Sequence, residues 1–126
     1  MKKIIHTTSA PAPIGPYSQA LFVKGFLFVS GQIAINPSTG NIVLEDRKAE
    51  TIQVMENIKS ILTASDLNFS HIVKTSIFLK DMNDFALVNE VYGSYFNADF
   101  PARETIQVAK LPKDVNVEIS IVAVAD

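Results

Sequence analysis

The chain contains no cysteine, only two histidines and no long apolar run. Without cysteine it has no disulfide, no thiol nucleophile and no cysteine-based zinc or iron–sulfur site. The apolar run that follows Lys2 and Lys3 stops after Ile4 and Ile5, so it is too short for an export signal or a membrane span. We therefore expect a cytoplasmic protein with no membrane partner.

The two histidines do not suggest a metal site. His6 and His71 lie 65 residues apart, and neither has a carboxylate beside it at the spacing of metal ligands. The Gly-x-Gly-x-x-Gly, Walker and Gly-x-Ser-x-Gly motifs are also absent. We expect no bound metal, and nothing points to a nucleotide site or to a serine hydrolase.

Basic residues are neither numerous nor clustered. Eleven lysines and arginines stand against thirteen aspartates and glutamates, which gives a formal net charge of −2. A protein that binds nucleic acid usually carries a basic patch that meets the phosphates. The aromatic residues are not interleaved with basic ones either, as single-strand binders require. RNA and DNA are therefore not expected as partners.

Hydrophobic residues, in contrast, are abundant. With 126 residues, of which 48% are hydrophobic, the chain is long enough to bury a core. Its composition does not change along its length, so we expect one domain over residues 1–126. The three prolines of "SAPAPIGP" (residues 9–16) lack backbone donors and predict a loop that joins no sheet.

Turn residues and β-rich runs predict five strands. The runs Leu21–Val23 and Phe26–Val29 flank Lys24 and Gly25 and predict a hairpin whose second strand ends at Ser30-Gly31. The segment "NPSTGN" predicts a second reversal. The other predicted strands cover residues 71–79, 103–108 and 115–124, with a turn around residues 111–114 before the last.

Two further segments have the period of a helix. Apolar residues recur at three- and four-residue steps between Asp46 and Ser65, which predicts a helix with one buried stripe. That stripe is expected to contain Ile52, Met55, Ile58 and Leu62, flanked by Val54 and Ile61. Asp84 can cap a second helix. Its inner stripe is expected to contain Phe85, Val88, Tyr92, Tyr95 and Phe96.

The resulting order, β-β-α-β-α-β-β, indicates an α+β fold with two helices on one face of a sheet. On the last strand Glu118 alternates with buried-type residues, and on the strand before it Arg103, Thr105 and Gln107 oppose Ile106. We expect these polar side chains to share the face without helices.

That face also carries apolar side chains. Val122, Val124 and several residues of the hairpin fall on it, which makes it too apolar to be freely wetted. We therefore expect a homo-oligomer with sites near the subunit boundaries.

Arg103 and Glu118 are the strongest candidates for chemistry. A guanidinium stays charged at any working pH and can hold a carboxylate through two parallel hydrogen bonds. A carboxylate such as Glu118 can bind a proton or orient a water, and burial would raise its pKa. The alternatives are an ion pair of Arg103 with Asp99 or Glu104, and a solvated or lysine-paired Glu118.

Weaker candidates lie where loops meet strands. Tyr17 and Ser18 follow Ile14-Gly15-Pro16, a place from which a phenol can cover a ligand or simply cap the core. Ser30 offers a hydroxyl, and Gly31 offers an amide that a ligand can approach closely because glycine has no side chain. The alternative for Ser30-Gly31 is an ordinary turn at the end of a strand.

Four segments resemble a known family in order and spacing. The segments "APAPIGPYSQA", "FVSGQIAINPSTG", "IVKTSIFLKDMNDFALVNEVYGSYF" and "FPARETIQVAKLPKDVNVEI" are similar to the Rid family of reactive intermediate deaminases, also called YjgF proteins. The resemblance runs almost end to end. It implies a chorismate-mutase-like α+β fold with two helices on one face of a mixed sheet, in a homotrimer with clefts between subunits.

The resemblance also implies an activity and a set of site residues. The activity is hydrolysis of 2-imino acids, such as 2-iminobutanoate and 2-iminopropanoate, to 2-keto acids and ammonia, with no cofactor and no metal. Arg103 matches the arginine that holds the substrate carboxylate, and Glu118 matches the glutamate that positions or activates water. The matching pocket positions are Tyr17, Ser30, Gly31, Phe85 and Asn89.

One position departs from the family pattern. Relatives often carry cysteine two residues after the arginine, where this chain has Thr105, whose backbone carbonyl is still expected to bind the imine nitrogen. Two other functions stay open: a non-catalytic regulator that binds a metabolite and acts through protein partners, and an RNA-directed translation inhibitor or ribonuclease, which the charge balance disfavours.

Overall fold

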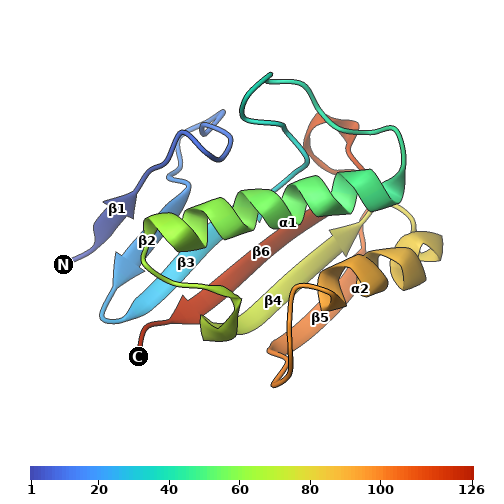
Figure 1. Ribbon diagram of the computed structural model, residues 1–126. Helices are drawn as coiled ribbons and strands as arrows, with labels where there is room; N and C mark the ends of the chain where they lie inside the picture. The colour runs from blue at the N-terminus through green and yellow to red at the C-terminus, as the bar shows by residue number, and fades with distance from the viewer.

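Six strands form one mixed sheet, and both helices cover the same face of it (Figure 1). The computed structural model describes all 126 residues. In chain order the elements are β1 (Lys3–Ile5), β2 (Ala20–Val23), β3 (Phe26–Gln32), α1 (Arg47–Ala64), β4 (Ile72–Leu79), α2 (Phe85–Gly93), β5 (Ala102–Gln107) and β6 (Val117–Val124). Short 3-10 turns cover Phe69–His71, Met82–Asp84 and Pro112–Asp114.

The sheet has the order β1-β2-β3-β6-β4-β5. β4 and β5 run parallel because α2 connects them as a crossover, and the other neighbours are antiparallel. The predicted α+β order and the mixed sheet are confirmed. β1 adds one strand that the sequence did not predict, and it pairs with the first strand of the predicted hairpin.

Helix α1 has the predicted position. The side chain of Asp46 accepts a hydrogen bond of 2.7 Å from the amide of Ala49 and so caps the N-terminus of the helix. The expected burial of Ile52 is wrong, since that side chain is 39% exposed. Thr51 takes its place on the buried stripe, and its hydroxyl bonds to the carbonyl of Arg47 at 2.7 Å.

Helix α2 differs from its prediction at both ends. Asp84 stands at the N-cap position, but its side chain makes no capping bond, and Asp81 caps the preceding turn instead. Phe85 is 38% exposed, so the expectation that it belongs to the inner stripe is wrong. The helix ends at Gly93, and Tyr95 and Phe96 pack against the core from the turn that follows.

The main core lies between the sheet and the two helices. Its largest side chains with no more than 1% exposure include Leu27, Ile58, Leu62, Ile77 and Ile119. A smaller cluster of Ile33, Leu111 and Val115 lies apart from it. This second cluster fixes the segments that lead into the functional site, because residues 33 and 115 adjoin β3 and β6.

A buried carboxylate ties α1 to the start of β6. The side chain of Glu50 is fully buried and accepts hydrogen bonds from the backbone amides of Asn116 (2.8 Å) and Val117 (3.1 Å). It also accepts one from the side-chain amide of Asn116 (2.9 Å) and lies 3.2 Å from Nε of Arg47. These contacts fix the backbone immediately before Glu118.

The face of the sheet opposite the helices is apolar and open. Phe26, Phe28, Val73 and Ile106 are each 42–46% exposed. The rings of Phe26 and Phe28 stack with their centroids 6.1 Å apart. Exposed apolar side chains gathered on one face usually mark an interaction site. Neither helix is long and apolar enough to cross a membrane.

We predict that Glu50→Ala lowers the free energy of unfolding by about 3–5 kcal/mol, because it leaves Arg47 and two buried amides without their partner. Urea unfolding followed by circular dichroism measures this. Glu90→Ala, which removes an exposed carboxylate from α2, is the matched control and should change stability by less than about 0.5 kcal/mol. A loss below about 1 kcal/mol for Glu50→Ala would show that the hydrogen bonds and the ion pair of Glu50 do not stabilise the fold.

Candidate functional site

β3 has an irregularity close to the side chain of Glu118, opposite Ser120 of β6. Val29 pairs with Ile121 and Gln32 pairs with Ile119, so Ser30 and Gly31 together oppose a single residue of β6. This is a β-bulge, a feature that often re-aims side chains beside active sites. The predicted end of the strand at Ser30-Gly31 is wrong, because β3 continues through the bulge to Gln32.

Gly31 lets the carboxylate of Glu118 approach the backbone of β3. A Cβ atom at position 31 would lie 2.5 Å from Oε2 of Glu118 and 2.8 Å from its carboxyl carbon, which is closer than atoms can pack. The absence of a side chain is therefore what opens this space. Ser30 is already engaged, since its hydroxyl donates a hydrogen bond of 2.6 Å to the carbonyl of Ser18.

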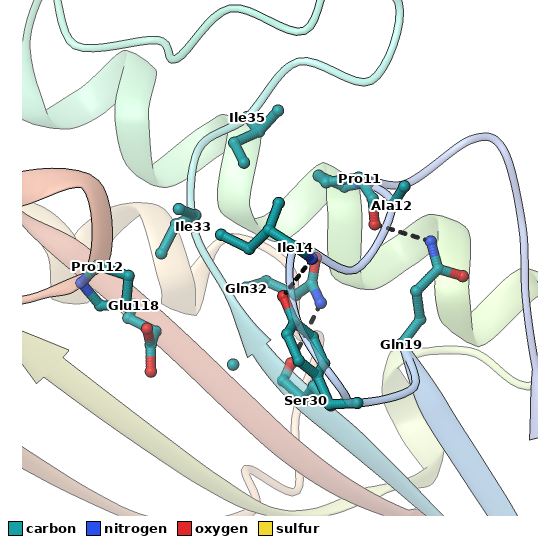
Figure 2. Close-up of a pocket in the computed structure, with 12 residues that line it drawn as sticks. Pro11, Ala12, Ile14, Gln19, Ser30, Gln32, Ile33, Ile35, Pro112 and Glu118 are labelled. Carbon is teal, nitrogen blue, oxygen red and sulfur yellow. Dashed lines mark hydrogen bonds between the residues drawn. The ribbon is translucent and has the colours of Figure 1, made fainter.

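Glu118, Ser30, Gly31 and Tyr17 line one cavity of about 440 Å³. Figure 2 shows Glu118 beside Pro112 at one end, with the isoleucine side chains between it and the loop that carries Pro11. The phenol oxygen of Tyr17 accepts a hydrogen bond of 3.3 Å from the amide of Ile14, and the ring is about half exposed. Four of the predicted site residues are thus brought together.

The carboxylate of Glu118 has no ion pair and no hydrogen bond within the chain. Its partial burial raises its pKa above the ordinary range of a carboxyl group. The predicted alternative, in which a lysine pairs with Glu118, is therefore wrong. An unpartnered carboxylate with a raised pKa beside a cavity is a candidate for proton transfer or for holding water.

Arg103 lies in a different environment, against α2. Its Nη1 donates a hydrogen bond of 2.6 Å to the side-chain oxygen of Asn89. Its guanidinium carbon lies 5.7 Å from the centre of the Phe85 ring and 5.3 Å from the centre of the Tyr92 ring. Two aromatic rings and one amide therefore hold the guanidinium in a fixed position.

Arg103 makes no ion pair within the chain, so the predicted alternative of a partner at Asp99 or Glu104 is wrong. Glu104 instead pairs with Lys74 at 2.7 Å on the open face. An arginine that is oriented by an amide and by rings, but not neutralised, retains donors for an anionic ligand.

The expectation that Arg103 and Glu118 share the face without helices is wrong. Arg103 pairs with the buried Thr75 of β4, whose hydroxyl accepts a hydrogen bond from Tyr92 of α2 at 2.9 Å, so Arg103 points to the helix side. Glu118 alternates with the buried Val117 and therefore points to the open side.

The two side chains are also offset along the sheet. Arg103 pairs with Thr75 and Glu118 pairs with Phe78, three residues further along β4, which corresponds to about 10 Å. A second cavity of about 450 Å³ contains Arg103 and Asn89, together with Tyr92, Gly93, Phe100 and Pro101. One chain therefore carries two separate half-sites.

Tyr92 and Thr105 complete the surroundings of Arg103. Burial raises the pKa of the Tyr92 phenol, while the hydrogen bond to Thr75 and the charge of Arg103 act in the opposite direction. The hydroxyl of Thr105 is buried with no hydrogen-bond partner, on the same side of β5 as Arg103. The proposed contact of its backbone carbonyl with an imine remains a prediction.

Sequence reasoning missed most of the wall around Glu118. The cavity is also lined by Pro11, Ala12, Ile14, Gln19, Gln32, Ile33, Ile35 and Pro112. Their types are those of an ordinary core or loop, so only their neighbours in the fold reveal their role. No group of three or more histidine, aspartate or glutamate side chains is arranged to hold a metal ion.

Comparison with known proteins gives one consistent result. The model of the family described as "Endoribonuclease L-PSP" matches residues 7–125. A RutC family protein of Pyrococcus horikoshii is 53% identical, with 98% of each chain covered. The 2-iminobutanoate/2-iminopropanoate deaminase of Salmonella typhimurium is 49% identical, again with 98% of each chain covered.

A solved structure is similar throughout. A protein of unknown function of the conserved Rid protein family from Yersinia pestis has a TM-score of 0.97 and 44% identity, with 99% of this chain and 100% of that chain covered. The fold, the end-to-end match and these relatives agree, and the chain belongs to the Rid family, also called the YjgF family.

Proposed function

We propose that the protein hydrolyses reactive 2-imino acids and their enamine tautomers, such as 2-iminobutanoate and 2-iminopropanoate, to 2-keto acids and ammonia. The observation that carries this proposal is the unpartnered carboxylate of Glu118, held beside Gly31 at the edge of an apolar cavity. The unpaired guanidinium of Arg103 supports it, as do relatives that carry this activity in their names.

The chemistry needs few groups. Arg103 binds the substrate carboxylate, and Glu118 accepts a proton from a water molecule as the water oxygen bonds to C2 of the protonated imine. Glu118 returns this proton to the nitrogen of the resulting carbinolamine, the C–N bond breaks so that ammonia leaves, and Glu118 accepts the hydroxyl proton as the C2 carbonyl forms. Imines already react with water, so a fixed cation and a placed water are sufficient, and no covalent nucleophile is required.

The two half-sites act together if copies of the chain assemble. Arg103 and Glu118 lie on opposite faces of the sheet, so one substrate molecule meets both only between two protomers. The open face, with Phe26, Phe28 and Ile106, supplies apolar surface for such contacts. We infer a ring-shaped homotrimer in which Arg103 of one protomer faces Glu118 of the next.

Imine hydrolysis fits the site better than RNA cleavage, although the family description refers to an endoribonuclease. The cavity beside Glu118 carries no basic side chain. One of the two histidines, His71, accepts a hydrogen bond from the amide of Asn68 and contacts Asp126 at the end of the chain. We place the activity in the cytoplasm, where imino acids arise from amino-acid metabolism.

We predict that Arg103→Ala lowers kcat/KM for imine hydrolysis by about 100-fold or more, because the substrate carboxylate loses its only fixed cation. The assay generates 2-iminobutanoate in situ and follows keto-acid release against a reaction without protein. Lys110→Ala, which removes an exposed charge from a loop, is the control and should retain full activity. Activity near the wild-type level in Arg103→Ala would refute the role of the guanidinium.

Glu118→Gln should lower kcat by about 100-fold to 10,000-fold and leave binding of 2-oxobutanoate intact, because glutamine keeps the shape but cannot accept the proton. In the wild type kcat should decrease as the pH falls through the raised pKa of Glu118, since the protonated carboxyl is inactive. This decrease in kcat at low pH should be absent in Glu118→Gln. Equal kcat in the two proteins would refute the role of Glu118, and wild-type hydrolysis no faster than the reaction without protein would favour a binding regulator over an enzyme.

We further predict that mixing the two inactive variants restores activity. When Arg103→Ala and Glu118→Gln chains are unfolded, mixed in equal amounts and refolded, about one quarter of the sites should contain both wild-type side chains. Keto-acid release should recover to about that fraction. Each variant refolded alone is the control. No recovery in mixtures that have assembled would show that each site uses a single chain.

A further inference from the structure

The cavity beside Glu118 is larger and more apolar than a three- or four-carbon acid needs. Its volume of about 440 Å³ falls within the range of pockets that hold drug-sized ligands. Beyond Glu118 its lining contains no charged side chain, and its walls include Pro11, Ile14, Ile33, Ile35 and Pro112. In Figure 2 these apolar side chains extend from Glu118 toward the loop that carries Pro11 and Ala12.

A second cavity adjoins this wall. It has a volume of about 420 Å³ and shares Pro11, Ala12, Ile14 and Ile35 with the first. The two cavities lie between the proline-rich loop and the segment that follows β3, and we refer to them together as the groove. Ile42 and Pro37 extend the apolar lining in the second part.

Both walls of the groove are held by buried amide side chains. Gln19, 2% exposed, accepts a hydrogen bond from the amide of Thr7 (2.8 Å) and donates to the carbonyl of Pro11 (2.8 Å). Asn57, 1% exposed, donates to the carbonyls of Ile33 (3.1 Å) and Ile35 (2.9 Å). The groove is therefore preformed, and a ligand does not have to open it.

We infer that this groove is a side-chain subsite that makes imino acids with aliphatic side chains of two to four carbons better substrates than 2-iminopropanoate. This inference rests on the proposed function for the position of the substrate's reacting carbon near Glu118. From there a longer alkyl chain runs along Ile33, Ile14 and Ile35, and each methylene leaves water for an apolar wall.

The residues at the far end of the groove suggest an alternative to an alkyl chain, namely a substrate side chain that ends in a carboxylate. His6 and Lys113 line the second cavity, and Lys113 makes no ion pair. A substrate with a second carboxylate would reach these two side chains only at the end of the groove. The continuous apolar wall before them favours an alkyl chain, and an acidic tail is the contrary outcome of the test.

Binding of stable 2-oxo acids tests the subsite without catalysis. We expect affinity measured by calorimetry to rise by about fourfold per methylene, or about 60-fold from pyruvate to 2-oxohexanoate. The same series of imino acids, generated in situ by an amino-acid oxidase, should show a parallel rise in kcat/KM. An affinity that is flat or falls along the series, or that is highest for 2-oxoadipate, would overturn the inference.

Two variants locate the effect in the groove. Ala12→Phe fills the wall that the two cavities share, and Ala12 is exposed, so the fold tolerates the change. It should reverse the preference for long chains. Ile14→Ser should reduce the ratio of long-chain to short-chain affinity by about tenfold. Ile4→Ser is its matched control, because Ile4 is 53% exposed against 58% for Ile14 and lies on β1.

The two proposals fail in different ways. If no imino acid is hydrolysed faster than without protein, but 2-oxo acids bind more tightly with chain length, the proposed activity fails and the subsite stands. If all imino acids are hydrolysed at equal rates and the 2-oxo acids bind equally, the activity stands and the subsite is refuted.

Discussion

The buried carboxylate of Glu50 is the interaction on which the geometry of the site depends. β6 begins beside a loop, and the amides of Asn116 and Val117 find their acceptor in this side chain of α1. A lone charge in the core would be very costly, but here Arg47 and three hydrogen bonds compensate it. The helix, the start of the strand and Glu118 are thereby fixed relative to one another, which holds the carboxylate of Glu118 close to Gly31 in the bulge of β3.

Much of the fold could be predicted from the sequence, because periodicity and turn chemistry are local. The hairpin around Gly25, the helix that begins after Asp46 and the alternation along β6 all follow from residues close in the chain. The face on which Arg103 lies could not be predicted in this way. A period of two tells which residues share a face, but the covered face of β5 is decided by its parallel pairing with β4 and by the position of α2.

The chemistry of the candidate site was easier to anticipate than its shape. Arg103 and Glu118 stand out by their type and by resemblance, and the structure leaves both without an ionic partner. Gln19 and Asn57 could not be found, since a buried amide that anchors a loop looks the same in sequence as one that faces water. The β-bulge was mistaken for the end of a strand because Ser-Gly is equally typical of both.

The two half-sites lie on opposite faces of one sheet. This placement affects how the rate of imine hydrolysis depends on the concentration of the protein. In the proposed assembly an isolated chain contributes either the arginine that binds the carboxylate or the glutamate that positions water to any one site. It never contributes both. When the protein is scarce enough for the ring to dissociate, turnover must then decline more steeply than expression, because encounters between chains limit it. A substitution at Phe26 or Phe28 that weakens the proposed trimer would abolish catalysis, although it leaves Arg103 and Glu118 unchanged. In the proposed assembly the chemistry would therefore depend on a hydrophobic surface that lies apart from the reacting groups.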